Sequence, residues 1–195
     1  VNLMLDAIGE NPVSSLQSGL ADAETAERVF NQTNKDVQSI GWHCNRERIY
    51  KLTRDVDNKF PLPSDTLTVD TVDEHAYINA VPRGSYLYDV KTQSLTWTST
   101  TDNDHSELYV DIVIQQEFTD LTSSLQRYIA ARAAREFQEV VLSSVAMDGF
   151  TRRKEQETYA HLLQDEAERE DANVLYDNEY SYKVTKRRNN RLYGY

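Results

Sequence analysis

Residues 44–117 interrupt two helical stretches with a different pattern, and this interruption is the strongest constraint on the fold. β-Branched and aromatic residues become frequent here, and helical periodicity fades. The connections between the candidate strands are too short for crossover helices, so the sheet is predicted to be antiparallel. The candidate strands read RIYKLT, TLTVDT, AYINAV, SYLYDV, SLTWTS and ELYVDIVI. The segment YLYDVKTQSLTW predicts a hairpin that turns near 91–94.

The residues before this interruption predict two helices. A short apolar stretch ends at Gly9, and Pro12 then prevents the helix from continuing. A second, amphipathic stretch begins with Asp22 as a candidate N-cap and closes at Gly41. Trp42 follows directly, and we expect its large side chain to be a buried anchor.

Helical periodicity returns after the interruption. A long helix is predicted over 119–149, with Thr119 or Asp120 as its cap and an apolar stripe rich in alanine. A second helix, over about 152–172, has few apolar positions and many acidic ones. We expect this second helix to pack by a narrow seam and to expose most of its surface.

The end of the chain carries a charge opposite to the rest. The formal net charge is −11, but the last 15 residues contain five basic residues and no acid. Without these five, 16 basic residues remain against 32 acidic ones, a net charge of −16. Tyr180, Tyr182 and Val184 recur at a spacing of two, which is typical of an extended segment. The sequence therefore ends in a basic, aromatic arm.

Together these patterns predict an α+β fold. The N- and C-terminal helices form one helical bundle, an antiparallel β region is inserted between them, and an extended C-terminal arm follows. The predicted units are 1–41 with 118–172 for the bundle, 44–117 for the β insert and 173–195 for the arm. A chain of 195 residues is long enough to bury such a core.

Several kinds of site lack their sequence signature. The four histidines are scattered, with no i, i+4 pair and no CxxC, so no metal site is predicted. His43 and Cys44 are adjacent soft ligands, but neighbours in a strand point to opposite faces. Without a GxGxxG, P-loop or GxSxG motif, we expect no cofactor and no hydrolase nucleophile. The single cysteine allows no intramolecular disulfide, and no apolar run is long enough to span a membrane.

The acidic residues leave one enzymatic alternative open. Glu107, Asp111 and Glu117 lie near Tyr109 and Trp97 in the sequence, as the carboxylates and aromatic platform of a glycan hydrolase would. A solvated acidic strand face explains the pattern more simply, because 32 acidic residues make chance neighbours common. We therefore predict that the chain is not an enzyme, with a glycan hydrolase using paired carboxylates as the alternative.

The basic arm has three interpretations. Its cations would neutralise phosphates and its tyrosines would stack on bases if it bound nucleic acid, but the acidic body repels that polymer. The simplest interpretation is a solvated tail. The third is an arm that binds an acidic protein surface, with its tyrosines as anchors in pockets.

Three segments of the chain carry a resemblance to a known family. They are LMLDAIGENPVSSL near the start, DVQSIGWHCNRE after the amphipathic stretch, and YIAARAAREF in the long late helix. In their order and spacing these segments resemble the tail tubular protein A family, the head-to-tail adaptors of short-tailed, podovirus-type bacteriophages. The resemblance covers nearly the whole chain, and its most specific part is AIGE-P-V-SL followed by VQS-GW.

The resemblance implies a structural virion protein of the tail, at the portal vertex, assembled in the host cytoplasm. Family members form a closed ring of about twelve copies between the portal protein and the nozzle protein, tail tubular protein B. Tail fibres attach near the adaptor–nozzle junction, and DNA passes through the channel during ejection. An acidic lumen would let DNA slide without binding. Some members are described as hydrolysing glycans, but the resemblance assigns no catalytic residue in this chain.

Within this picture, we expect the arm to dock on the portal in a groove between neighbouring portal subunits. Its cations would meet acidic groups and its tyrosines would fill pockets, and these contacts would offset the cost of ordering it. The candidate residues are Tyr180, Tyr182, Lys186, Arg187, Arg188, Arg191, Tyr193 and Tyr195.

Overall fold

The computed structural model describes residues 1–8, 21–72, 78–97, 105–141 and 145–169. They form helices at both ends with strands between them, so the predicted α+β fold is confirmed. The helices are α1 (Asn2–Ile8), α2 (Ala21–Gln38), α3 (Ser123–Val141) and α4 (Val145–Arg169). The strands are β1 (Arg46–Thr53), β2 (Thr66–Thr71), β3 (Ala80–Arg83), β4 (Tyr86–Asp89) and β5 (Glu107–Ile114). The predicted boundaries of bundle, insert and arm stay a prediction.

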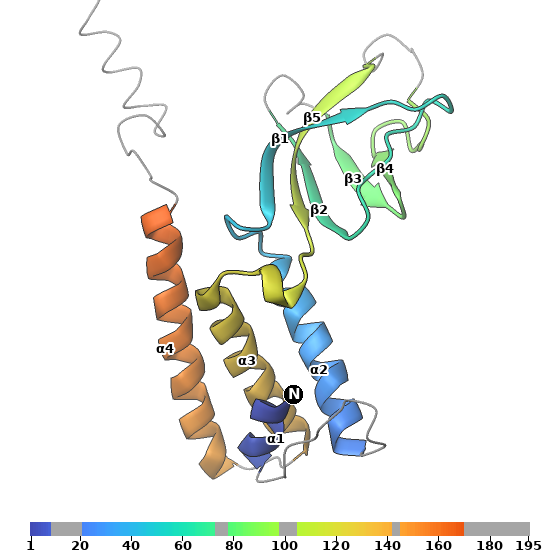
Figure 1. Cartoon of the computed structure of the whole chain (residues 1–195). Coiled ribbons are helices and arrows are strands. Elements are labelled where there is room, and N and C mark those ends of the chain that lie inside the picture. Colours follow the sequence, from blue (N-terminus) through green and yellow to red (C-terminus); the bar gives the residue numbers. More distant parts are fainter. Residues whose placement is uncertain (9–20, 73–77, 98–104, 142–144, 170–195) are drawn as a thin grey trace, which may run out of the picture.

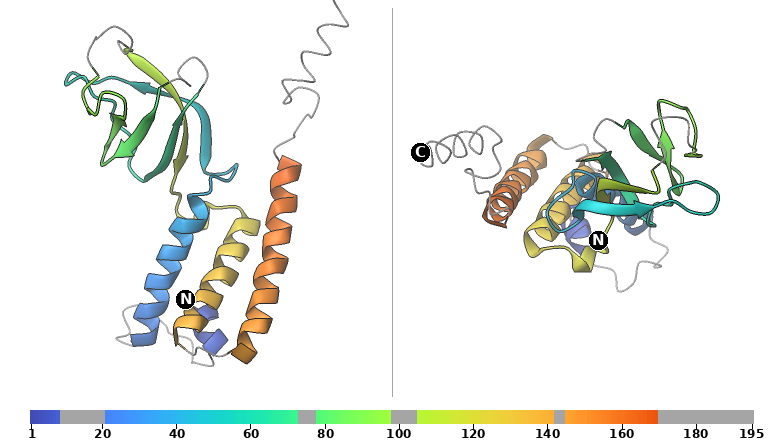
Figure 2. Two further views of the ribbon diagram at one scale, coloured as in Figure 1. Left: turned by 180° about the vertical axis from the view of Figure 1, so that it is seen from behind. Right: turned by 90° about the horizontal axis from the view of Figure 1, so that it is seen from above.

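The three long helices lie side by side, with α3 in the middle (Figure 1). α2 and α4 both run toward the strands, and α3 runs the opposite way between them. The short α1 lies against this layer at the end far from the strands (Figure 2). Its Met4 and Leu5 are buried in one apolar cluster with Ala26 and Val29 of α2 and Phe137 of α3. The apolar stripes of these helices therefore meet in a shared core.

The strands project from one end of the helix layer. β5 is the central strand of an antiparallel sheet with β1 and β2 on either side, and β3 and β4 form a separate antiparallel pair. Leu108, Val110 and Ile112 of β5 are buried together with Phe60 and Trp97. This alternation gives β5 one face in the core and one face toward solvent. The predicted antiparallel arrangement is confirmed.

The hairpin predicted over 86–97 is confirmed only at its turn, and its second strand does not form. β4 pairs instead with β3, through a turn at Gly84, whose φ is 63°. Asp89 meets Ser94 only as an isolated bridge, because its carboxylate accepts hydrogen bonds from the residues that follow it and closes a tight turn. Trp97 then enters the core, where its indole N–H donates to a β4 carbonyl at 3.1 Å. The described part of SLTWTS is accordingly not a strand.

The long helix predicted over 119–149 is also wrong in extent. It is divided, because α3 ends at Val141 and α4 begins at Val145. α3 begins at Ser123, and the predicted cap residues belong to a preceding 3-10 turn, Phe118–Asp120. Apolar periodicity does not locate such boundaries, because the spacing of apolar residues continues across them.

One buried polar network joins the two points where the chain crosses between helices and strands. Gln38, at the end of α2, is fully buried, and its amide donates to the Gln116 carbonyl at 3.0 Å and accepts the Gln116 N–H at 2.8 Å. The Asn45 amide donates to the carbonyls of Gln38 and Ile114 at 3.0 and 3.2 Å. Its oxygen accepts the Trp42 N–H at 2.9 Å. The chain entering β1 is thereby tied to the chain leaving β5.

Gly41 and Trp42 complete this junction. Trp42 is 5% exposed, and its indole N–H donates to the Val37 carbonyl at 2.8 Å, so the predicted anchor is confirmed. Gly41 has a φ of 84°, and a Cβ there would lie 2.8 Å from the Val113 side chain, so glycine alone fits at this turn. Asp22, the predicted N-cap of this helix, instead lies within its first turn.

Two buried glutamines provide a matched test of the junction network. Gln138 on α3 is 2% exposed, and within the described residues its amide makes no hydrogen bond. We expect Gln38→Met to lower the free energy of unfolding by about 2–4 kcal/mol, because the Gln116 backbone and the buried Asn34 amide lose their hydrogen-bond partner. Gln138→Met should leave the free energy of unfolding unchanged or raise it by about 1 kcal/mol, because no hydrogen bond is lost. Urea unfolding followed by circular dichroism measures both, and equal losses would contradict the role of the network.

Candidate functional site

The arm residues predicted to bind the portal lie outside the described residues, and their role stays a prediction. They are Tyr180, Tyr182, Lys186, Arg187, Arg188, Arg191, Tyr193 and Tyr195. The helix that leads into the arm, α4, is described through Arg169. The candidate site within the described residues is therefore the attachment and the outer surface of α4.

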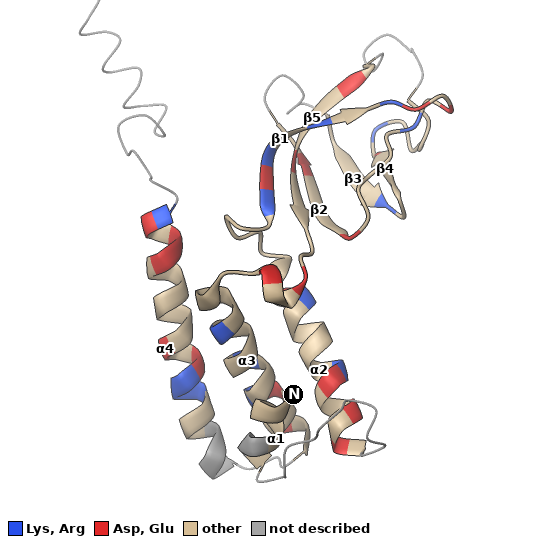
Figure 3. Cartoon of the chain, in the orientation of Figure 1, with Lys and Arg blue, Asp and Glu red and all other residues tan. Residues whose placement is uncertain are grey.

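α4 is attached to the helix layer along one narrow seam, as predicted. Among residues 149–169, only Thr158 and Leu162 are buried, and Leu162 packs into the apolar cluster formed with α2 and α3. The Tyr159 ring lies 5.1 Å from the Tyr128 ring of α3. Charged residues occupy much of the remaining surface of the helix (Figure 3). α4 thus presents a large polar surface that the rest of the described chain does not cover.

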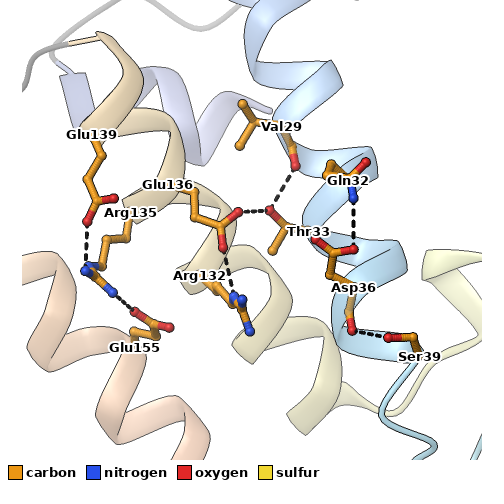
Figure 4. A network of polar contacts seen from close by, with 10 residues as sticks. All are labelled: Val29, Gln32, Thr33, Asp36, Ser39, Arg132, Arg135, Glu136, Glu139 and Glu155. Carbon is orange, nitrogen blue, oxygen red and sulfur yellow. Dashed lines mark hydrogen bonds and ion pairs between the residues drawn. The ribbon is translucent and has the colours of Figure 1, made fainter.

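α3 carries charged links on both sides (Figure 4). Toward α4, the Arg135 guanidinium pairs with the Glu155 carboxylate at 2.9 Å. Toward α2, the Glu136 carboxylate accepts the buried Thr33 hydroxyl at 2.5 Å. Glu136 also pairs with Arg132 at 2.8 Å, and this hydrogen bond raises the pKa of the Arg132 guanidinium above its ordinary value. The central helix therefore holds its two neighbours by polar contacts as well as by apolar packing.

The last described turns of α4 contact the junction between helices and strands. The Glu166 carboxylate accepts the His43 N–H at 3.1 Å and also contacts the His43 imidazole. Asp165 accepts the Ser124 hydroxyl at 2.5 Å and pairs with Arg169 at 3.0 Å. These hydrogen bonds, first that from Ser124 and then that from Arg169, lower the pKa of Asp165. Two neighbouring carboxylates therefore fix this end of α4.

A surface hollow of about 600 Å³ lies between the start of α3 and the second half of α4. Apart from Leu121 its lining residues are polar, among them Arg127, His161 and Glu168, whereas small-molecule sites are lined mainly by hydrophobic and aromatic residues. No group of three or more His, Cys, Asp or Glu side chains in the described part of the chain could hold a metal ion. Burial raises the pKa of the Cys44 thiol, which favours its protonated, less reactive form.

The residues of the enzymatic alternative do not form one surface. Trp97 is 2% exposed in the core, whereas Glu107 and Asp111 lie on the opposite face of β5. The Glu107 carboxylate pairs with Lys51 at 2.6 Å, and the Asp111 carboxylate pairs with Arg46 at 2.6 Å. This arrangement agrees with the simpler interpretation, an acidic strand face balanced by cations.

A family model described as tail tubular protein matches residues 1–172. The chain belongs to the tail tubular protein family of phages. The matched range contains all the described helices and strands, from α1 to α4. A search of the curated proteins found no match.

Membership in the tail tubular protein family makes the chain a structural component of the phage tail. This is a family of structural virion proteins and not of enzymes, and it implies assembly with other virion proteins. The resemblance seen in the sequence is thus confirmed. None of the described helices is both long enough and apolar enough to cross a membrane.

The polar residues that attach α4 were not predicted from the sequence. Arg135 lies seven residues after Tyr128, and Glu155 lies seven residues before Leu162, so each occupies the same stripe as an apolar seam residue. This heptad spacing is the signal that identifies them. The contact of His43 with α4 has no local signature, because the two segments are far apart in the sequence.

The neighbouring leucines of α4 test the seam. Leu162 is fully buried, whereas Leu163 is 46% exposed. We expect Leu162→Ala to lower the free energy of unfolding by about 2–5 kcal/mol, because it leaves a cavity between α3 and α4. Leu163→Ala should lower the free energy of unfolding by less than about 1 kcal/mol, because this side chain is exposed. Urea unfolding gives both values, and amide hydrogen exchange should show faster exchange in α4 for the first variant only.

The Ser124–Asp165 hydrogen bond gives a prediction about pH. A carboxyl whose folded pKa is lowered adds stability above its unfolded pKa, and this stability is lost as the pH falls through the folded pKa. We expect Ser124→Ala to raise the pKa of Asp165, and therefore to lose less stability than the wild type on acidification below about pH 4. Carboxyl-carbon NMR titration measures the pKa. Ser123→Ala is the control, and an unchanged Asp165 titration in Ser124→Ala would contradict the assignment.

Proposed function

We propose that this chain is a subunit of a ring-shaped head-to-tail adaptor. In this proposal about twelve copies form a closed ring between the portal protein and the nozzle protein, tail tubular protein B. Tail fibres attach near the junction with the nozzle, and DNA passes through the central channel during ejection. The observation that carries the proposal is the match to the tail tubular protein family over residues 1–172.

The helix layer supports a ring because it has two different edges. A closed ring uses a head-to-tail contact, in which one face of each subunit meets a different face of the next. α2 forms one edge of the layer and α4 the other, with α3 between them (Figure 1). The outward residues of both helices are exposed. Each copy therefore offers two distinct helical faces to neighbours on either side.

The charge of the chain supports passage of DNA without binding. Residues 1–180 carry a net charge of −16, which repels phosphates. Proteins that hold DNA do the opposite, because their cations replace the counterions of the phosphates. A channel lined by such subunits would keep DNA free to move.

In the same proposal the C-terminal arm joins the ring to the portal. Its cations and tyrosines suit an acidic protein surface that offers pockets between subunits. The residues proposed for this contact are Tyr180, Tyr182, Lys186, Arg187, Arg188, Arg191, Tyr193 and Tyr195.

Removal of the arm tests the portal contact. We expect a chain that ends at Asp177 to stay folded and to lose its binding to purified portal rings, measured by co-sedimentation. The full chain with Arg187, Arg188 and Arg191 changed to glutamine should bind at least about tenfold more weakly, because the charge attraction is removed. Unimpaired binding by the shortened chain would contradict the role of the arm. Failure of the full chain to bind portal rings would contradict the adaptor itself.

A further inference from the structure

The outward face of α2 carries a regular stripe of exposed polar residues. Glu24, Arg28, Asn31 and Lys35 follow one another at steps of four, three and four, which places them on one side of a helix. All four are exposed. The buried residues of α2 lie on its other side, against α1 and α3. The stripe therefore faces away from the helix layer.

α4 carries a stripe with the same spacing on the opposite edge of the layer. Arg153, Glu157, Ala160 and Gln164 also follow at steps of four, three and four, and all are exposed. Phe150, three residues earlier, extends the stripe with an apolar ring that is 80% exposed. The seam with α3 lies on the other side of the helix. This stripe also faces away from the layer.

The two stripes carry their charges in opposite order. From the end far from the strands, α2 presents the acid Glu24 and then the base Arg28, whereas α4 presents the base Arg153 and then the acid Glu157. α2 and α4 both run toward the strands, so the order of charges along each helix is read in the same direction (Figures 1 and 3). Within the described residues, none of these four side chains forms an ion pair.

We propose that α4 of one copy packs along α2 of the next copy, with Arg153 beside Glu24 and Glu157 beside Arg28. The inference rests on the proposed ring, because rotation about an axis along the helices keeps α2 and α4 of neighbouring copies parallel. In that orientation each charge meets its opposite, which sets the register of the contact. The small side chain of Ala160 lets the two helices approach each other at the middle of the stripes.

A second copy of this chain fits these stripes for a reason of geometry. Both faces belong to every copy, they have equal spacing, and they lie on opposite edges of one layer. Pairing one with the other leaves a free α2 face and a free α4 face at the two ends of any open chain of copies. Only closure into a ring satisfies every face.

Charge reversal on each stripe tests the pairing. The α2 variant carries Glu24→Lys and Arg28→Glu, and the α4 variant carries Arg153→Glu and Glu157→Lys. Compared with the wild type, we expect each variant alone to form at least about tenfold fewer adaptor rings bound to the portal, because like charges meet at every contact between copies. A 1:1 mixture should restore the ring with the two variants alternating, since each reversed face then meets a reversed partner. One chain with all four changes should assemble by itself.

The readout is native mass spectrometry of adaptor copies bound to purified portal rings. Circular dichroism and thermal unfolding should match the wild type, because all four positions are exposed. Lys51→Glu with Glu107→Lys, which swaps an ion pair on the strands, is the control and should assemble normally.

The outcomes separate this inference from the proposed function. Wild-type rings together with undisturbed assembly of both variants would overturn the α2–α4 contact and leave the adaptor standing. Loss of assembly in both variants without rescue in the mixture would overturn the pairing of these two stripes. Absence of any wild-type ring would overturn the proposed function itself.

Discussion

The arrangement of the molecule depends on the buried amides of Gln38 and Asn45. The chain passes from helix to strand after α2 and returns after β5, and these two amides bond the two passages to each other. A buried amide that loses its partners costs about 1–3 kcal/mol, so the two passages hold one geometry. The strands are thereby fixed in position relative to α2 and α3. The contact of Glu166 with His43 also fixes the end of α4 relative to this junction.

The way in which α4 is held accounts for its exposed surface. Leu162 packs into the apolar cluster, the Tyr159 ring contacts α3, and charged or hydroxyl groups add further links to α3. A helix attached by so narrow a seam keeps most of its circumference for other contacts. An exposed helical surface is consistent with membership in the tail tubular protein family, which implies assembly with other virion proteins.

Prediction from sequence succeeded where one local pattern decides the structure and failed where distant segments compete. The α+β class, the glycine turn at Gly41 and the buried Trp42 follow from periodicity, backbone freedom and side-chain size. The partner of β4 does not, because the segments on both sides of β4 had strand-like composition and composition does not say which of them pairs with it. The candidate site divides in the same way. The narrow seam of α4 was predictable from its few apolar positions, whereas its partners His43 and Ser124 were not.

The sequence by itself determined the α+β class, the strongly acidic body, the basic charge of the last 15 residues and the family to which the chain belongs. These follow from residue order alone, because periodicity, charge and motifs are local properties. The tertiary structure decided the order of the strands, the pairing of Gln38 with Asn45 and Gln116, and the placement of two matching charged stripes on opposite edges of one layer. Those features depend on residues far apart in the chain. They form only when tertiary packing buries some faces of the helices and strands and leaves others exposed.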